Sequence, residues 1–199
     1  MTALGCGQFI VRLVEAKNGK QETRQWSGLE LLRSLAWLKR MNARGYDVTV
    51  RPAGPHGLVL LDGLQQADVQ RLDARGWQSA AVVEVQHGRF QAWIKLSVHP
   101  VADALRGQAA SRLAAELCRS GSAITVAEFG PLAGLTCHVP GMAERPAARY
   151  ALLQASSGAV AAAAAPCLER MAHLPDPPLP PRLSMPQGAV RKRSSGRAR

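Results

Sequence analysis

Apolar side chains recur with a helical period in the first third of the chain. Between residues 27 and 45 they fall at helical spacing at Leu31, Leu32, Leu35, Ala36 and Leu38. Ser27 and Glu30 match the capping-box pattern, in which each side chain bonds a free backbone N–H at a helix start. Gly45 follows several basic residues, and both features are typical of a helix end. We therefore predict a helix over residues 27–45.

Strand patterns follow this helix. Residues 46–52 alternate apolar and polar side chains and contain β-branched residues, whereas residues 58–62 form a short apolar run. The Pro/Gly-rich residues 53–57 between them predict a tight turn. We therefore expect these two strands to form a hairpin.

The same alternation of elements continues toward the C-terminus. Residues 63–76 predict a second amphipathic helix, and residues 101–121 predict a third. Between them, residues 80–97 predict a hairpin that turns at His87 and Gly88. This order predicts an α/β (α+β) fold, in which helices pack on one face of a mixed or antiparallel sheet of hairpins.

The last third of the ordered sequence has weaker patterns. Residues 123–141, punctuated by glycine and proline, predict a loop around one short strand, and residues 148–158 predict a final strand. Residues 159–173 predict an alanine-rich helix that kinks or ends near Pro166.

Composition indicates one globular domain with a basic tail. Residues 1–173 are sufficient for a single core, whereas the proline-rich residues 174–199 bury too little apolar surface to fold. The net charge is +11, and the tail contributes cations at Arg191, Lys192, Arg193, Arg197 and Arg199. Such charge suits nucleic acid, because each phosphate neutralised releases counterions, but it also serves solubility. We favour nucleic acid as the partner of the chain; for the tail, contact with single-stranded DNA and a role in solubility remain open.

Several classes of protein lack support in the sequence. No apolar run approaches the length of about 20 residues that crosses a bilayer, and no secretory signal is evident, so we expect a cytoplasmic protein without membrane contact. The four cysteines show no C-x-x-C spacing, and Cys137 with His138 is a weak zinc pattern. P-loop, G-x-S-x-G, H-E-x-x-H and Rossmann motifs are absent.

Asp62 has two interpretations on the local sequence alone. It comes directly after the second predicted strand, where a carboxylate could hold a metal ion. It also begins a D-x-x-Q pattern with Gln65, and aspartate is a preferred N-cap residue. The cap is the more common use of such a residue.

Three runs resemble a known family. YDVTVRPAGPHGLVLLDGL, AAVVEVQHGRFQAWIKL and EFGPLAGLT lie within residues 27–140 and resemble, in order and spacing, the catalytic domain of plasmid RepB-type DNA primases. These belong to the archaeo-eukaryotic primase group. The resemblance implies primer synthesis from nucleotides on single-stranded DNA in plasmid or mobile-element replication. It also implies Mg²⁺ or Mn²⁺ held by several carboxylates, because such ions prefer oxygen ligands.

The family's acidic residues map only partly onto this chain. The resemblance implies that Asp62 is the catalytic residue and metal ligand, but Gly63 stands where the family has a second aspartate. Thr125 stands at the third acidic position, and Glu128 is the nearest substitute.

Other family positions are partly kept. Gln91 and Trp93 match the hairpin motif, and the resemblance implies that Gln91, with Arg51, His56 and Lys95, lies near the nucleotide phosphates. Four further positions differ from the family residues: Arg89, Pro131, Cys137 and Val139.

Two functions therefore remain open. One is a DNA primase with metal-dependent nucleotidyl transfer centred on Asp62. The other is a catalytically inactive descendant that binds DNA, or a plasmid replication or transfer protein, through the same fold. Loss of carboxylates from a DNA-facing groove also removes repulsion against phosphate, which favours binding.

Overall fold

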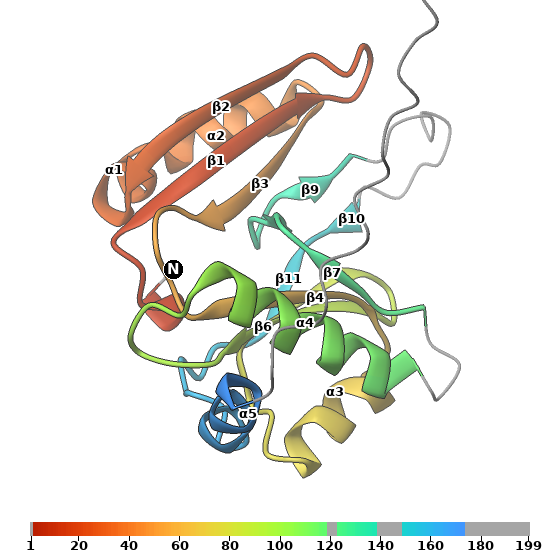
Figure 1. The fold of residues 1–199 in the computed structure, drawn as a ribbon. Coiled ribbons are helices and arrows are strands. Elements are labelled where there is room, and N and C mark those ends of the chain that lie inside the picture. Colours follow the sequence, from red (N-terminus) through yellow and green to blue (C-terminus); the bar gives the residue numbers. More distant parts are fainter. Residues whose placement is uncertain (1, 119–122, 139–148, 174–199) are drawn as a thin grey trace, which may run out of the picture.

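The structure is a computed structural model that describes residues 2–118, 123–138 and 149–173, and most of its strands form two antiparallel sheets (Figure 1). The first sheet has the order β2-β1-β3-β8. Its strands are β1 (Gln8–Glu15), β2 (Gln21–Ser27), β3 (Tyr46–Pro52) and β8 (Gly130–Pro131). β1 and β2 form a hairpin for which the sequence pattern gave no prediction.

The second sheet has the order β11-β5-β6-β4-β7. Its strands are β4 (Leu58–Leu64), β5 (Ser79–Gln86), β6 (Arg89–Lys95), β7 (Thr125–Ala127) and β11 (Leu152–Ala155). β5 and β6 pair around Gly88, which confirms the hairpin predicted there. A separate two-stranded ladder joins β9 (Thr136–Cys137) to β10 (Arg149–Tyr150).

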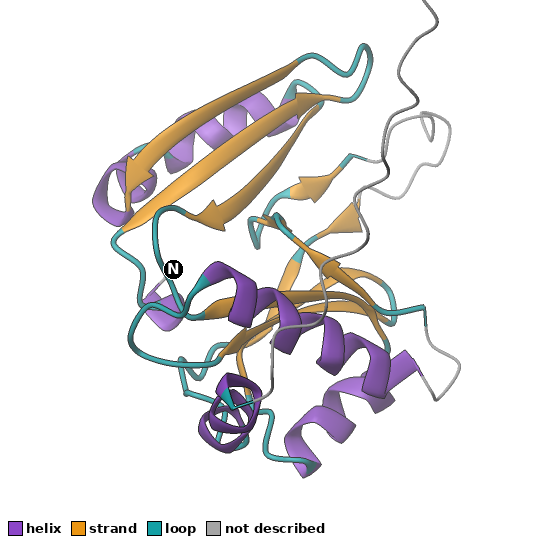
Figure 2. Ribbon diagram, viewed as in Figure 1, coloured by secondary structure: helices purple, strands orange, loops and turns teal. Residues whose placement is uncertain are grey.

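The predicted hairpin over residues 46–62 is wrong, although both of its strands exist. β3 pairs with β1 and β8, whereas β4 pairs with β6 and β7 in the other sheet. Residues 53–57 cross between the sheets instead of folding one strand back on the other (Figure 2). The crossover passes so close to the loop after β6 that a Cβ on Gly57 would lie 2.6 Å from the Ser97 carbonyl oxygen.

Two helices accompany the first sheet. The capping box of Ser27 and Glu30 is present, as predicted, at the start of α1 (Gly28–Arg33). The predicted single helix is divided at Ser34, and α2 (Leu35–Ala43) follows. Leu31 and Leu38 are buried, but Leu32 is 57% exposed, so only one row of the predicted apolar stripe faces the core. The 3-10 turn η1 (Thr2–Leu4) precedes β1.

Three helices lie beside the second sheet (Figure 1). They supply apolar side chains to its core. They are α3 (Gln66–Ala74), α4 (Asp103–Cys118) and α5 (Ala164–Ala172). The alanine-rich helix was predicted to kink or end near Pro166, but α5 begins two residues before this proline. Proline is tolerated in a first helical turn, where its missing N–H would have no intrahelical partner.

The two faces of β4 belong to different hydrophobic core clusters. Val59 and Leu61 pack with side chains of α3, α4 and α5, whereas Leu58 and Leu60 cluster with residues of the first sheet. β4 is thus buried on both faces, which explains its continuous apolar run. The α+β class predicted from the sequence is confirmed, but with the strands divided between two sheets. Among the described residues, no helix is long and apolar enough to cross a membrane.

Candidate nucleic-acid interface

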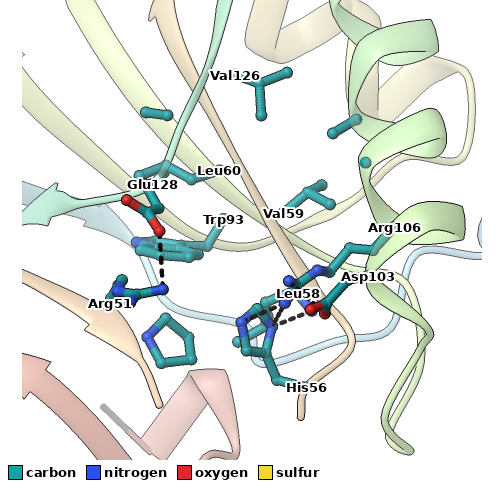
Figure 3. A pocket seen from close by; sticks show the side chains of 14 residues that line it. Arg51, His56, Leu58, Val59, Leu60, Trp93, Asp103, Arg106, Val126 and Glu128 are labelled. Carbon is teal, nitrogen blue, oxygen red and sulfur yellow. Dashed lines mark hydrogen bonds and ion pairs between the residues drawn. The ribbon is translucent and has the colours of Figure 1, made fainter. Parts of the chain in front are cut away.

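A cavity of about 250 Å³ lies where the crossover enters the second sheet (Figure 3). Its polar lining comes from both sheets and from α4. These side chains are Arg51, His56, Trp93, Asp103, Arg106 and Glu128. Two of the four residues that the resemblance placed near phosphate, Arg51 and His56, therefore lie at one cavity.

Arg51 projects from β3 toward the segment that follows β7. Its Nη1 lies 2.9 Å from Oε1 of Glu128, whose side chain is 69% exposed. Arg51 Nε is buried and has no hydrogen-bond partner among the described residues. One nitrogen of the guanidinium is thus bound to a carboxylate, and a second is an unsatisfied donor that is buried from solvent.

Phe129 brings a second arginine to this region. The guanidinium carbon of Arg12 lies 3.9 Å from the Phe129 ring centroid, and that of Arg51 lies 5.3 Å from it. Arg12 Nε also donates a hydrogen bond of 3.3 Å to Thr49 Oγ1 on β3. Arginine on an aromatic face is held by attraction to the ring's π electrons, so Phe129 fixes two cations on the face of the first sheet that borders the cavity. The cavity and this face of the sheet are called the groove below.

His56 is a neutral side chain in this setting. Its Nδ1 accepts a hydrogen bond of 3.1 Å from Leu58 N, and the Arg106 guanidinium lies against both ring nitrogens. Arg106 in turn pairs with Asp103 at 2.8 Å. Burial, followed by the charge of Arg106, lowers the pKa of His56 to about 4. The imidazole is therefore an acceptor near neutral pH, and the cation at this edge of the cavity is Arg106.

Gln91 and Lys95 lie apart from this cavity. Gln91 Oε1 is buried without a hydrogen-bond partner in the described residues, and a Cβ on Gly130 would lie 3.3 Å from it. Lys95 is 9% exposed and its Nζ donates a hydrogen bond of 2.9 Å to the Gly158 carbonyl oxygen. The structure thus separates Lys95 from Arg51, with which the resemblance had grouped it.

Asp62 is not the N-cap of a helix, so that prediction is wrong. Its Oδ1 accepts a hydrogen bond of 2.7 Å from Gly63 N, and both residues still belong to β4. The cap of α3 is Gln65, and Asp68 supplies the return bond of the capping box, at 3.0 Å to Gln65 N.

The described carboxylates do not fit the metal site that the resemblance implies. Asp62 faces Thr125 across the β4–β7 ladder, and Gly63 has no side chain. Glu128, the nearest substitute, is paired with Arg51. In residues 2–118, 123–138 and 149–173, no group of three His, Cys, Asp or Glu side chains could hold a metal ion. A two-ion site needs several such ligands around each ion.

Cys137 and His138 have structural contacts. Burial, followed by the charge of Asp47, raises the pKa of the Cys137 thiol to about 11, so this sulfur is a poor ligand near neutral pH. His138 Nε2 lies 2.9 Å from the carbonyl oxygen of Asn42. Asn42 is itself buried and joins α2 to β9 through Thr136.

Two residues of this interface, Arg12 and Arg106, were not found from the sequence. Arg12 lies in a segment to which no element was assigned, although its alternation with the apolar residues Val11 and Leu13 was a usable strand signal. Arg106 is one of several basic residues on predicted helices, and only its distant contact with His56 distinguishes it. The predicted DNA-binding cations Arg191, Lys192, Arg193, Arg197 and Arg199 lie outside the described residues.

Two antiparallel sheets that meet at a cavity with arginines in its lining form a fold shared with solved primases, and sequence comparison specifies the family. Residues 13–139 match the RepB DNA-primase N-terminal domain family, and the chain belongs to it. Mobilization protein A of Escherichia coli is 42% identical in an alignment 142 residues long, and the match covers 68% of this chain and 19% of that protein. The chain therefore spans about a fifth of that relative's length.

Two solved structures share the fold. The crystal structure of primase RepB′ has a TM-score of 0.77 and 35% identity, covering 86% of this chain and 59% of the other. The crystal structure of the catalytic domain of primase RepB′ in complex with initiator DNA has a TM-score of 0.75 and 35% identity. That match covers 86% of this chain and 88% of the other.

Proposed function

We propose that this chain is a DNA-binding domain of the primase fold that acts on single-stranded DNA in plasmid replication or mobilisation. The observation that carries the proposal is its similarity to a catalytic domain of that fold solved in complex with initiator DNA. At 35% identity over 86% of this chain, a shared mode of binding is a reasonable expectation. Plasmid replication or transfer proteins are further candidate partners.

The cations at the groove give this proposal a physical basis. Arg12 and Arg51 come from neighbouring strands and are both held on Phe129, so their guanidinium groups are fixed before a ligand arrives. Arg106 supplies a third cation from α4 at the other side of the cavity. Guanidinium groups match phosphate oxygens in charge and in geometry. The groove is thus expected to track the phosphates of a single strand.

DNA binding is tested by replacing groove arginines and a matched arginine elsewhere. The double variant Arg12→Gln/Arg51→Gln is expected to weaken binding of a single-stranded oligonucleotide. Each lost phosphate contact lowers the slope of log affinity against log salt by about 0.7, so about 1.4 is expected in total. Arg112→Gln is the control, because Arg112 lies on α4, pairs with Glu116 and does not line the cavity.

Fluorescence anisotropy across a salt series measures both the affinity and its slope. An equal loss in the double variant and in the Arg112→Gln control would contradict the groove as the interface. Deleting residues 174–199 measures the basic tail separately. A lower salt slope is expected after the deletion, and an unchanged slope would remove the tail from the proposal.

Metal-dependent nucleotidyl transfer is the second candidate function. The observation that favours it is the position of Asp62, two residues beyond Leu60 on β4. Alternate residues of a strand share a face, and Leu60 lines the cavity, so Asp62 is expected on the groove side. The described donors do not fit two ions, so we assign no catalytic step to them.

A primer-synthesis assay distinguishes the two functions. The purified chain is incubated with single-stranded template, nucleotides and Mg²⁺ or Mn²⁺. Product that is abolished by Asp62→Asn would support the enzyme, with Asp62 as its catalytic residue. Salt-sensitive DNA binding without product would support the binding domain.

A further inference from the structure

β2 is the outer strand of the first sheet, and one of its edges is free (Figure 1). Among the described residues, β2 pairs with β1 alone, and residues 21–25 are exposed. The strand contains no proline, and its register with β1 runs without a shift over seven residue pairs. A free edge of this kind presents unpaired backbone N–H and C=O groups, to which a further strand can add.

The backbone groups that point out from this edge belong to Gln21, Thr23 and Gln25. At the turn end of the β1–β2 hairpin, Glu15 N donates a hydrogen bond of 2.8 Å to the carbonyl oxygen of Lys20, so the backbone groups of Lys20 point toward β1. Direction alternates along a strand, and the regular register carries this alternation through the hairpin. Every second residue from Gln21 onward therefore presents its N–H and C=O to the free edge.

The sequence around Thr23 is complementary to itself in an antiparallel pair. When two copies of β2 meet with Thr23 opposite its own equivalent, Gln21 of each copy lies opposite Gln25 of the other. In the same register, Glu22 of each copy lies opposite Arg24 of the other. The side chains of Glu22 and Arg24 are 45% and 47% exposed, so both charges can reach across the pair.

The two charges select this register. Within one strand, Arg24 Nη2 lies 3.4 Å from Glu22 Oε2, and the Arg24 guanidinium carbon lies 4.6 Å from the Trp37 ring centroid, which holds the cation in place. Centring the pair on Glu22 or on Arg24 would place like charges opposite each other, which destabilises a cross-strand pair. Among registers centred within residues 22–25, only the one centred on Thr23 places opposite charges face to face. The pair then contains charges of alternating sign, two from each copy.

We propose that the free edge of β2 is a self-association site, at which a second copy of this chain adds its own β2 in antiparallel orientation. The first sheets of the two copies then join into one continuous sheet. Residues directly opposite each other in such a pair share a face, so the twofold axis is perpendicular to the sheet and both grooves open on the same side. The proposal does not rest on DNA binding, and its tests contain no DNA.

Sedimentation velocity of the wild-type chain at rising concentration is the first measurement. Because a pair of short strands buries less than a standard interface, a reversible dimer with a Kd on the order of 10 μM is expected. Glu22→Arg and Arg24→Glu are each expected to weaken the dimer at least about tenfold, since each places like charges opposite one another at both ends of the pair. Glu116→Arg is the matched control, because it makes the same change of charge on α4, away from β2.

Mixing the two strand variants gives a sharper test. Glu22→Arg leaves two cations on this part of the strand, and Arg24→Glu leaves two carboxylates, so each protein is expected to pair with the other better than with itself. An equimolar mixture should therefore restore the dimer, as should the double variant Glu22→Arg/Arg24→Glu, which exchanges the charges. A local folding defect would not be rescued by mixing. A mixture that stays monomeric, or equal weakening in Glu22→Arg and the Glu116→Arg control, would overturn the proposal.

Thr23→Pro tests the backbone part of the contact. It removes the N–H at the centre of the pair without removing a bond to β1, since this N–H points outward. The dimer should be lost in Thr23→Pro and kept in Thr23→Ala, which retains the N–H, and circular dichroism checks that both variants fold. A dimer equally stable in both would contradict pairing through this edge. A wild-type chain that stays monomeric up to roughly 200 μM, well above the expected Kd, would overturn the proposal and leave the edge to a strand of another protein.

Discussion

Arg51 and Glu128 form an ion pair across the groove, with Arg51 Nη1 2.9 Å from Glu128 Oε1. The pair joins β3 of the first sheet to the segment that follows β7 of the second. A carboxylate therefore occupies the position at which Arg51 would contact a phosphate. Glu128, the nearest substitute for a missing metal ligand, is instead the counterion of a candidate DNA-binding residue.

The first prediction is that Glu128→Gln increases affinity for single-stranded DNA. The substitution frees Arg51 and removes a charge that repels phosphate. Exposed ion pairs are worth up to about 1 kcal/mol, so a gain of up to about fivefold is expected at low salt. Fluorescence anisotropy at two salt concentrations measures the gain, which should shrink at the higher one.

Glu116→Gln is the control for this prediction, because it removes the same charge from α4, outside the cavity. An equal gain in the control would show a general effect of net charge. A loss of affinity in Glu128→Gln would show that the ion pair orders the groove for its ligand.

The second prediction concerns the roles of Asp62 and Asp68 in stability. Asp68 is 1% exposed, bonds Gln65 N at 3.0 Å and pairs with Arg71 at 3.0 Å. Asp68→Ala is expected to lower the free energy of unfolding by about 2 kcal/mol. Asp62→Ala removes one bond to Gly63 and should cost less than about 1 kcal/mol. Urea denaturation of both variants tests the order, and a larger cost for Asp62→Ala would contradict it.

Local sequence patterns predicted the helices and strands well, but they predicted poorly which strands pair with one another. The capping box of Ser27 and Glu30 involves only neighbouring residues, and it forms as predicted. The strands over residues 46–62 were also recognised, but their division between two sheets depends on β1, β6, β7 and β8. A Pro/Gly-rich connection is compatible with either a hairpin or a crossover. Only the tertiary pairing decides between them.

The candidate site shows the same limit. Arg51 and His56 are close in sequence, and both line one cavity. Arg12 reaches this region through contact with Thr49, 37 residues away, and Arg106 reaches His56 across 50 residues. Such contacts have no local signature. The position of Lys95 is likewise set by a distant contact, because its partner Gly158 lies 63 residues further along the chain.

The third prediction is a pH-dependent loss of stability caused by His56. Its ordinary pKa of 6.5 falls to about 4 in the folded chain, chiefly through burial. Between these values the unfolded chain binds a proton that the folded chain does not, so the free energy of unfolding falls as pH decreases. His56→Gln should reduce the loss between pH 7 and pH 5 by about 1 kcal/mol, after allowance for solvent screening.

Urea denaturation at the two pH values measures this difference. His87→Gln is the control, because His87 lies fully exposed at the β5–β6 turn. Asp47, whose pKa is raised by burial, titrates equally in all three proteins and cancels. A pH dependence that is unchanged in His56→Gln would show that His56 does not cause the loss.

The fourth prediction is that a second aspartate cannot simply be restored beside Asp62. Gly63 has φ of 81°, and a Cβ there would lie 2.5 Å from the Ala123 carbonyl oxygen. Gly63→Asp is expected to lower the free energy of unfolding by more than about 2 kcal/mol, through backbone strain and this contact. Gly45→Asp is the control, since Gly45 has φ of 91° but no atom near its Cβ position. Urea denaturation should show a smaller cost at Gly45; equal costs would mean that the Ala123 contact relaxes freely.

The fifth prediction is that Thr125→Asp creates a divalent-cation site that the wild-type chain lacks among its described residues. Thr125 is exposed and lies opposite Asp62 in the β4–β7 ladder, where Cβ atoms of paired residues are about 5 Å apart. Two carboxylates at this separation repel each other and can share one Mn²⁺ ion.

Titration of the protein with Mn²⁺, monitored by electron paramagnetic resonance, should show Mn²⁺ binding in Thr125→Asp. Mn²⁺ should also raise the melting temperature of this variant. The double variant Asp62→Asn/Thr125→Asp is the control and should lose both effects. Binding that persists in the double variant would place the ion away from Asp62, whereas binding lost there would identify Asp62 as one of its ligands.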